Sequence, residues 1–143
     1  MLDEDAKVRL RIARQEILTK EKPVEFTALI HECVLREVLV SPAVQASQLR
    51  HLLAIGTLAN VTVQVVRAGV GWHPGLDGSF ILYEFLDTPS IVHIEHFSSS
   101  AFLYEDRDVA NFKAAARIVR GVAMSPEDSA ELIAEVMEDM EMR

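Results

Sequence analysis

Three groups of residues in this sequence carry side chains that could do chemistry. They are His31-Glu32-Cys33, the single His73, and the set His93, Glu95 and His96. His93 and Glu95 stand two apart in a predicted strand and therefore share a face, a spacing that could place two metal ligands together. The alternative is that these are half-exposed strand and loop residues whose hydrogen bonds stabilise the sheet. We favour the alternative and expect no metal and no cofactor.

Known catalytic motifs are incomplete in this chain. His93-Ile94-Glu95 fits the His-x-Glu of zinc deaminases, but a single cysteine cannot supply the Pro-Cys-x-x-Cys partner. Gly69-Val70-Gly71 lacks the third glycine and the following helix of a dinucleotide-binding loop. Cys33 and His31 make a weak nucleophile pair, because positions so close in sequence rarely give the needed geometry. We therefore expect Cys33 to be a core thiol and the protein not to be an enzyme.

The segment from Gly69 to Gly78 is the most informative stretch. Its four glycines allow positive φ and close backbone approach. Trp72 supplies a flat apolar ring, and His73 supplies a polar ring. A binding pocket or an interface would use such a loop. An ordinary long hairpin loop, with Trp72 folded back on the sheet, explains it equally well.

The apolar pattern predicts the elements that must position these residues. Ala6, Leu10, Ala13 and Ile17 recur at helical spacing, so we expect an amphipathic helix over 2–20. Its second apolar pair, Val8 and Ile12, hints at a further partner such as another subunit. The other predicted helices are a helical turn over 32–40, a helix from Ser41-Pro42 to about Leu58, one from about Asp106 to Ala123, and one from Ser125-Pro126 onward.

Strands are expected at 26–30, 61–66, 79–85 and 91–97. Short links favour antiparallel neighbours, because a parallel crossover needs a dozen or more residues. The link 67–77 is almost that long, but its glycines argue against a crossover helix. We predict an α+β fold, with a small, mainly antiparallel sheet of about four strands packed against helices, forming one domain over 1–143.

Composition and charge exclude several classes of protein. With 143 residues, 50% of them hydrophobic, the chain can fill one globular core, and it has no apolar run long enough for a membrane span. One cysteine and no signal peptide favour the cytoplasm. The formal charge is −8, and seven acids follow Ser125. Only the predicted first helix is locally basic, so we expect no direct binding to DNA.

The order of several short motifs resembles a known family. The domain that follows an XRE-type helix-turn-helix in actinobacterial regulators, the Scr-family antitoxin-like transcriptional regulators, is similar over nearly the whole chain. WhiJ-type developmental regulators are related in layout. The motifs are Arg14-Gln15-Glu16-Ile17-Leu18, 30–36 (IHECVLR), Gln48-Leu49-Arg50-His51-Leu52, 60–66 (NVTVQVV), 71–80 (GWHPGLDGSF), 92–95 (VHIE) and 124–129 (MSPEDS).

This resemblance implies a C-terminal regulatory domain that senses a ligand or partner and oligomerises. DNA would be bound by an N-terminal helix-turn-helix module, which this chain lacks, and a small protein encoded nearby would be a frequent partner. No catalytic residue is implied. We also expect a homodimer. As residues that bind the ligand or partner we select Trp72 and His73, with Glu32 and Glu95 fixing orientation.

Two rival functions remain open. The first is a small hydrolase that uses His73 or His93 with Glu95 as acid and base, which predicts a deep pocket with these groups within hydrogen-bond reach. The second is a standalone interaction module that binds another regulator. Fold analogy alone cannot choose between these and the regulatory domain, because function resides in a site.

Overall fold

The computed structural model describes residues 3–143, which form two compact units. Unit 1 contains the described residues up to Val65 together with 124–143, and unit 2 contains Val66–Ala123. The two ends of unit 2 are therefore both joined to unit 1, so unit 2 is an insertion in the chain of unit 1. The sequence patterns predicted a single domain and did not indicate this division.

Unit 1 is built on a two-stranded parallel sheet. Strand β1 (Phe26–His31) pairs with β2 (Val61–Val66), whose last residue lies at the start of unit 2. The segment between the strands holds helices α2 (Glu32–Arg36) and α3 (Pro42–Ile55), which is long enough for a parallel crossover. In β2 every residue except Thr62 is buried, as expected for a parallel strand covered on both faces.

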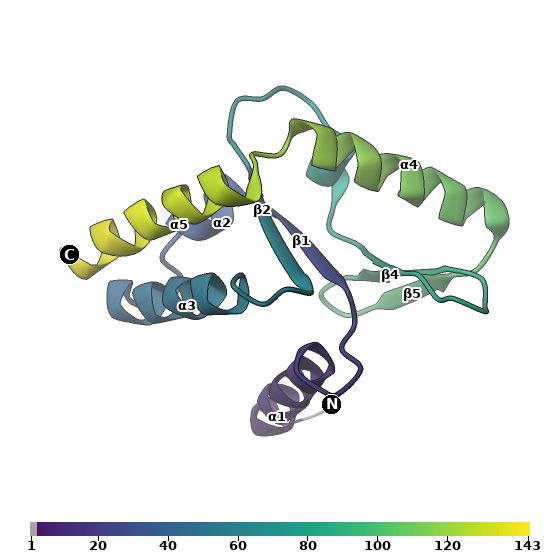
Figure 1. The fold of residues 1–143 in the computed structure, drawn as a ribbon, viewed down its shortest axis with the longest axis horizontal. Coiled ribbons are helices and arrows are strands. Elements are labelled where there is room, and N and C mark those ends of the chain that lie inside the picture. Colours follow the sequence, from purple (N-terminus) through teal and green to yellow (C-terminus); the bar gives the residue numbers. More distant parts are fainter. Residues whose placement is uncertain (1–2) are drawn as a thin grey trace. The chain divides into compact units, whose positions relative to one another are not determined.

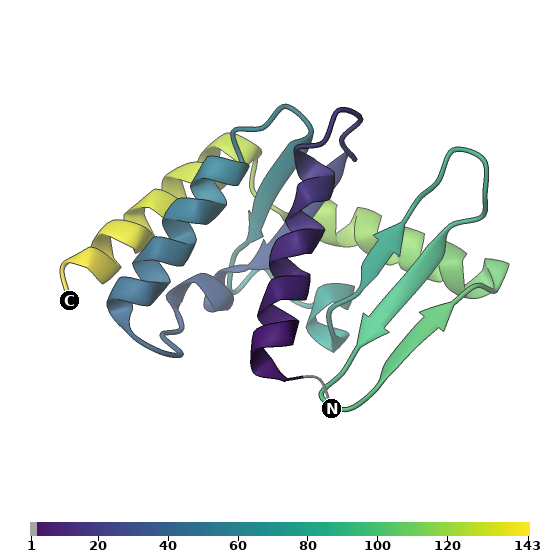
Figure 2. The same ribbon diagram turned by 90° about the horizontal axis from the view of Figure 1, so that it is seen from below.

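Helices α3 and α5 (Pro126–Glu141) lie side by side and supply most of the core of unit 1 (Figures 1 and 2). The buried residues of α5 recur at helical spacing and form one stripe: Ser129, Leu132, Ile133, Val136 and Met140. Apart from Ser129, they join Leu35, Ala46, Leu49, Val61, Val63 and Val65 in one cluster. Burial of each large side chain in this cluster contributes roughly 1.5–3 kcal/mol to folding.

Both helices begin at the capped serines that the sequence predicted. The hydroxyl of Ser41 accepts the backbone N–H of Val44 at 3.2 Å, and that of Ser125 accepts the N–H of Asp128 at 3.0 Å. A proline follows each serine in the first helical turn, where its missing N–H costs nothing. These two helix starts are confirmed.

A set of hydrogen bonds holds the start of α5 against β2. The backbone N–H of Met124 donates to the carbonyl oxygen of Val65 at 2.9 Å, and the N–H of Val65 donates to the Ser129 hydroxyl at 2.8 Å. The Gln64 side-chain amide donates to the carbonyl oxygen of Met124 at 2.8 Å. We call this set the strand clamp. It satisfies polar groups of β2 that a buried strand could not leave unpaired.

Hydrogen bonds from Asn60 hold the segment that follows the first helix. Helix α1 (Glu4–Arg14) continues as the 3-10 helix η1 (Gln15–Leu18), so the predicted helix is confirmed over 4–18, while Leu2 lies outside the described residues. The Asn60 side chain donates to the carbonyl oxygens of Leu18 at 3.0 Å and Val24 at 2.8 Å. These bonds fix the turn after η1, but no residue of α1 is buried.

Unit 2 consists of a three-stranded antiparallel sheet and one long helix. Strands β3 (Ile81–Tyr83), β4 (Ile91–Glu95) and β5 (Ser100–Leu103) follow one another as a meander, seen in Figure 2. Helix α4 (Asp106–Val122) covers the face that carries Val92 and Ile94. The segment from Gly69 to Gly78, which we call the glycine loop, contains the 3-10 helix η2 (Pro74–Asp77). This helix also packs on α4.

The prediction of one sheet with about four mainly antiparallel strands is wrong, although the α+β class is confirmed. Strands β3, β4 and β5 pair with one another in one sheet, and β1 pairs with β2 in the other. The long crossover that joins β1 to β2 contains α2 and α3. The fifth strand, β5, was not predicted. No helix within residues 3–143 has the length and apolarity needed to cross a membrane.

We predict that Ser129→Ala will lower the free energy of unfolding by about 1–3 kcal/mol, because it leaves the buried N–H of Val65 without an acceptor. Urea unfolding followed by circular dichroism measures this change. Ser47→Ala on the exposed face of α3 is the control and should stay within about 0.5 kcal/mol of the parent. Equal midpoints for the two variants would contradict a structural role for the strand clamp.

Candidate functional site

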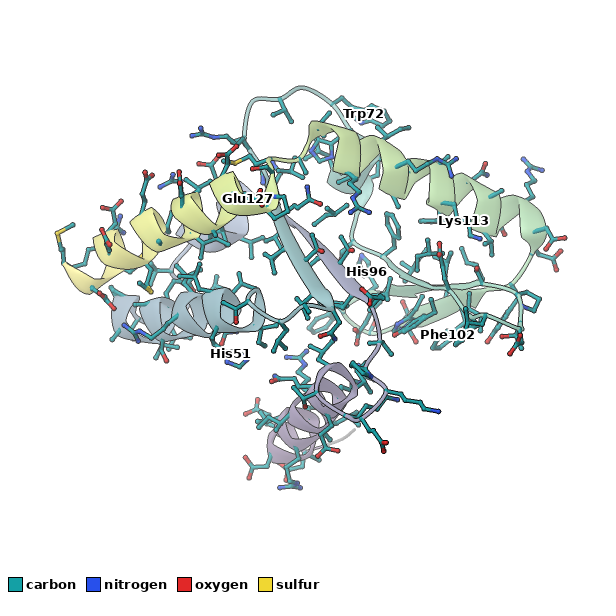
Figure 3. All side chains as sticks on the ribbon, in the orientation of Figure 1. His51, Trp72, His96, Phe102, Lys113 and Glu127 are labelled. Atoms are coloured by element: carbon teal, nitrogen blue, oxygen red, sulfur yellow. The ribbon has the colours of Figure 1, made fainter. Side chains whose placement is uncertain are left out.

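The four residues selected from the sequence occupy different environments. Trp72, His73 and Glu95 belong to unit 2, whereas Glu32 belongs to unit 1. Trp72 is 70% exposed and projects from the glycine loop (Figure 3), while His73 beside it is only 3% exposed. Within unit 2, the exposed indole and the buried imidazole therefore do not form the two walls of one pocket.

His73 is packed where η2 meets α4. Gly75 lies so close to its ring that a Cβ on the glycine would stand 3.0 Å from Nδ1 of His73 and 3.5 Å from Cγ2 of Val119. The absence of a side chain at Gly75 thus lets the imidazole fit beneath η2. This location suits a residue that fixes the glycine loop on α4.

The His31–Cys33 pair is closer than its sequence spacing suggested. Nδ1 of His31 lies 3.0 Å from Sγ of Cys33 and accepts the backbone N–H of Cys33 at 3.2 Å. Cys33 is exposed, so the prediction of a core thiol is wrong. The physical reason is that α2 turns Leu35, not Cys33, toward the core. Next to this pair the buried Glu32 accepts a hydrogen bond from Nε of Arg36 at 2.9 Å.

His93 and Glu95 share the face of β4 that points away from α4. The His93 ring stacks on Phe102 of β5, with ring centroids 4.4 Å apart and planes 7° apart. Glu95 pairs in register with Ser100 and is exposed. Among residues 3–143, no hydrogen bond joins His93 to Glu95, and no three His, Cys, Asp or Glu side chains are grouped as metal ligands would be.

Two clefts of unit 2 lie along α4, and sequence reasoning missed both. The first, which we call the α4 cleft, lies between the β3–β4 connection and residues Asp106, Val109, Ala110 and Lys113, and has a volume of about 400 Å³. The second, the glycine-loop cleft, has a volume of about 290 Å³. Its lining residues include Pro74, Asp77 and Gly78 of the glycine loop, with Asn111 and Phe112 of α4.

The glycine-loop cleft is lined by residues of the loop other than the predicted Trp72 and His73. Its apolar wall contains Phe80 and Phe112, whose rings meet edge to face with centroids 4.9 Å apart. Its polar groups come from Asp77, Ser79 and Asn111. Clefts of this size and mixed lining can hold small molecules. The repeat of Asp106, Val109, Ala110 and Lys113 on one helical face was the signal in the sequence that could have indicated the α4 cleft.

We predict stability effects of different size for the two neighbours in the glycine loop. Trp72→Ala should change the free energy of unfolding by less than about 0.5 kcal/mol, because the indole is exposed. His73→Ala should lower it by about 1–3 kcal/mol, because it removes a buried ring. Thermal and urea unfolding measure both values. A large loss for Trp72→Ala with none for His73→Ala would contradict this assignment.

We also predict that Cys33 reacts in the folded protein. Ellman's reagent should release one equivalent of thiolate per chain without denaturant, because the thiol is exposed. The control is the same reaction in concentrated urea, which should give the same stoichiometry. A thiol that reacts only after unfolding would show that Cys33 is buried after all.

Comparison with protein-family models places these observations in a family. Residues 3–135 match the model described as "Domain of unknown function (DUF5753)". The comparison with curated proteins gave no match, and neither did the comparison with solved structures. Because the match covers most of the sequence, this chain belongs to the DUF5753 family.

Proposed function

We propose that this chain is the sensing and oligomerising domain of a helix-turn-helix transcriptional regulator of the antitoxin-like, actinobacterial type. A separate N-terminal module would bind DNA, and the present domain would set how two such modules pair. The resemblance of the sequence motifs supports this role. The observation that carries the proposal is that Leu10 and Ile17, which share one side of the first helical segment, are exposed.

Helix α1 displays apolar side chains that the described structure leaves exposed. Val8, Leu10 and Ile12 are 54%, 47% and 61% exposed, and Ile17 in η1 is 43% exposed. The bonds of Asn60 hold the end of η1 and the residues that follow it. Isolated helices of this length are marginal in water, and their stability comes from packing an apolar face. An intermolecular contact supplies that packing.

The partner that best fits α1 is a second copy of α1 in antiparallel orientation. Its first turn is acidic, with Glu4 and Asp5, and its last turn is basic, with Arg11 and Arg14. Antiparallel pairing across a two-fold axis places the acidic end of each helix beside the basic end of the other. A parallel pair would instead place like charges together. Apolar contact and charge thus both favour the antiparallel homodimer.

The regulatory mechanism follows from this dimer. A ligand or a small neighbour-encoded protein that binds two conformations of the domain unequally shifts the population between them. That shift changes how the attached modules pair and therefore how tightly they hold two DNA half-sites. The domain acts in the cytoplasm and contacts DNA only through those modules.

A reporter experiment tests the proposal. The full chain is fused behind a DNA-binding module that represses a promoter only as a dimer, and repression is measured in cells. We predict repression by the parent fusion and at least about a ten-fold loss with Leu10→Asp/Ile17→Asp, because buried charges destabilise the pair. The control Leu39→Asp changes an 82% exposed leucine outside α1 and should leave repression unchanged.

Charge exchange then tests the orientation. Glu4→Lys/Asp5→Lys alone should weaken repression, and so should Arg11→Glu/Arg14→Glu alone. The two sets combined should restore it, because each exchanged end then faces the opposite charge again. A parent fusion that fails to repress, together with a monomer in light scattering, would rule out the oligomerising function.

A further inference from the structure

The α4 cleft carries two opposite charges separated by apolar surface. Asp106 and Lys113 stand seven residues apart on one face of α4, with Val109 and Ala110 between them. At 1.5 Å per residue this places their backbones about 10 Å apart along the helix. Figure 3 marks the position of Lys113 on α4.

Both charged groups of the cleft are available to a ligand. Neither Asp106 nor Lys113 forms an ion pair with another residue in the range 3–143. Lys113 is partly buried, so its ammonium gains more from an anionic partner than a fully exposed lysine would. Across the cleft, the β3–β4 connection contributes the ring of Phe85, the ring of Pro89 and the hydroxyl of Ser90.

The polarity of the cleft sets the orientation of a ligand. Glu105, Asp106 and Asp108 cluster at the start of α4, with Arg107 as the only base among them. This end attracts a cation, and the acids outweigh the attraction of the helix N-terminus for an anion. The Lys113 end attracts a carboxylate. Phosphate alone is disfavoured, because it would meet the acids at one end of the cleft.

We propose that the α4 cleft binds a short peptide of about three residues with free termini. Its ammonium lies at Asp106, its carboxylate at Lys113, and an apolar side chain lies between Phe85 and Val109. An extended residue spans at most about 3.3–3.6 Å, so three residues cover about the same distance as the rise between the backbones of Asp106 and Lys113, roughly 10 Å. A free amino acid covers about a third of that backbone distance. The volume of about 400 Å³ accommodates such a ligand.

The inference rests on the proposed sensing function for its biological meaning, but binding is measured directly. The probe is Ala-Phe-Ala, titrated into the full chain by calorimetry, with nuclear magnetic resonance shifts locating the site on α4 and the β3–β4 connection. Acetylating the amino terminus of the probe should weaken binding about ten-fold, and amidating its carboxyl terminus should do the same. Each loss removes one charge-assisted contact.

Variants assign each terminus to its residue. In Asp106→Asn the acetylated and free probes should bind equally, and in Lys113→Met the amidated and free probes should bind equally. Arg107→Met is the matched control, because it removes a positive charge from α4 outside the cleft lining. It should keep the full discrimination between the three probes.

Two outcomes would overturn the inference. No shifts in the cleft residues at millimolar probe would show that the cleft does not bind the peptide. Binding that ignores the blocked termini would show that the charges do not select the ligand. Either result is separate from the proposed dimer, because calorimetry and the resonance shifts measure peptide binding and not repression.

Discussion

The strand clamp is the constraint on which the rest of the structure depends. Unit 2 leaves unit 1 after Val65 and returns at Met124, and a hydrogen bond joins these two residues. The Ser129 hydroxyl completes the clamp by accepting the N–H of Val65, and it sits at the start of the buried stripe of α5. Strand β2, helix α5 and both ends of the insertion are therefore fixed by one local set of polar contacts.

Under the proposed function, unit 1 mediates oligomerisation and unit 2 mediates sensing. Unit 1 has the larger apolar core, and it contains α1, whose exposed apolar side chains the proposal assigns to contact with a second copy. Unit 2 contains both clefts, each lined by α4 and a loop. Loops held on a rigid helix are common places for binding sites, because the helix fixes one wall while the loop varies. Oligomerisation and sensing are thus assigned to separate surfaces.

Local signals in the sequence predicted local structure well. The pairs Ser41-Pro42 and Ser125-Pro126 marked two helix starts, because an N-cap hydroxyl and a first-turn proline act on adjacent residues. The glycines of the 69–78 loop correctly excluded a crossover helix, since the only helical turn there is η2 among the described residues. The stripe of α5 followed directly from its apolar spacing.

Features that depend on distant residues could not be predicted in this way. The parallel pairing of β1 with β2 joins strands separated by two helices, and neither strand alone specifies its partner or direction. The exposure of Cys33 depends on how the short α2 is turned against α5. The α4 cleft exists because the β3–β4 connection stands opposite one face of a helix. The helical spacing of Asp106, Val109 and Lys113 marks one wall of the cleft, but no motif marks the segment that stands opposite it.

The acidic face of α5 has an electrostatic consequence for any complex with DNA. Seven carboxylates lie on its exposed side, and among the described residues an ion pair is formed by Glu141, with Arg50. Such a surface repels the phosphate backbone, and the repulsion weakens as salt screens it. Under the proposed function, a duplex held by a separate module would be kept away from α5. The negative charge of this helix limits the directions from which a polyanion can approach unit 1.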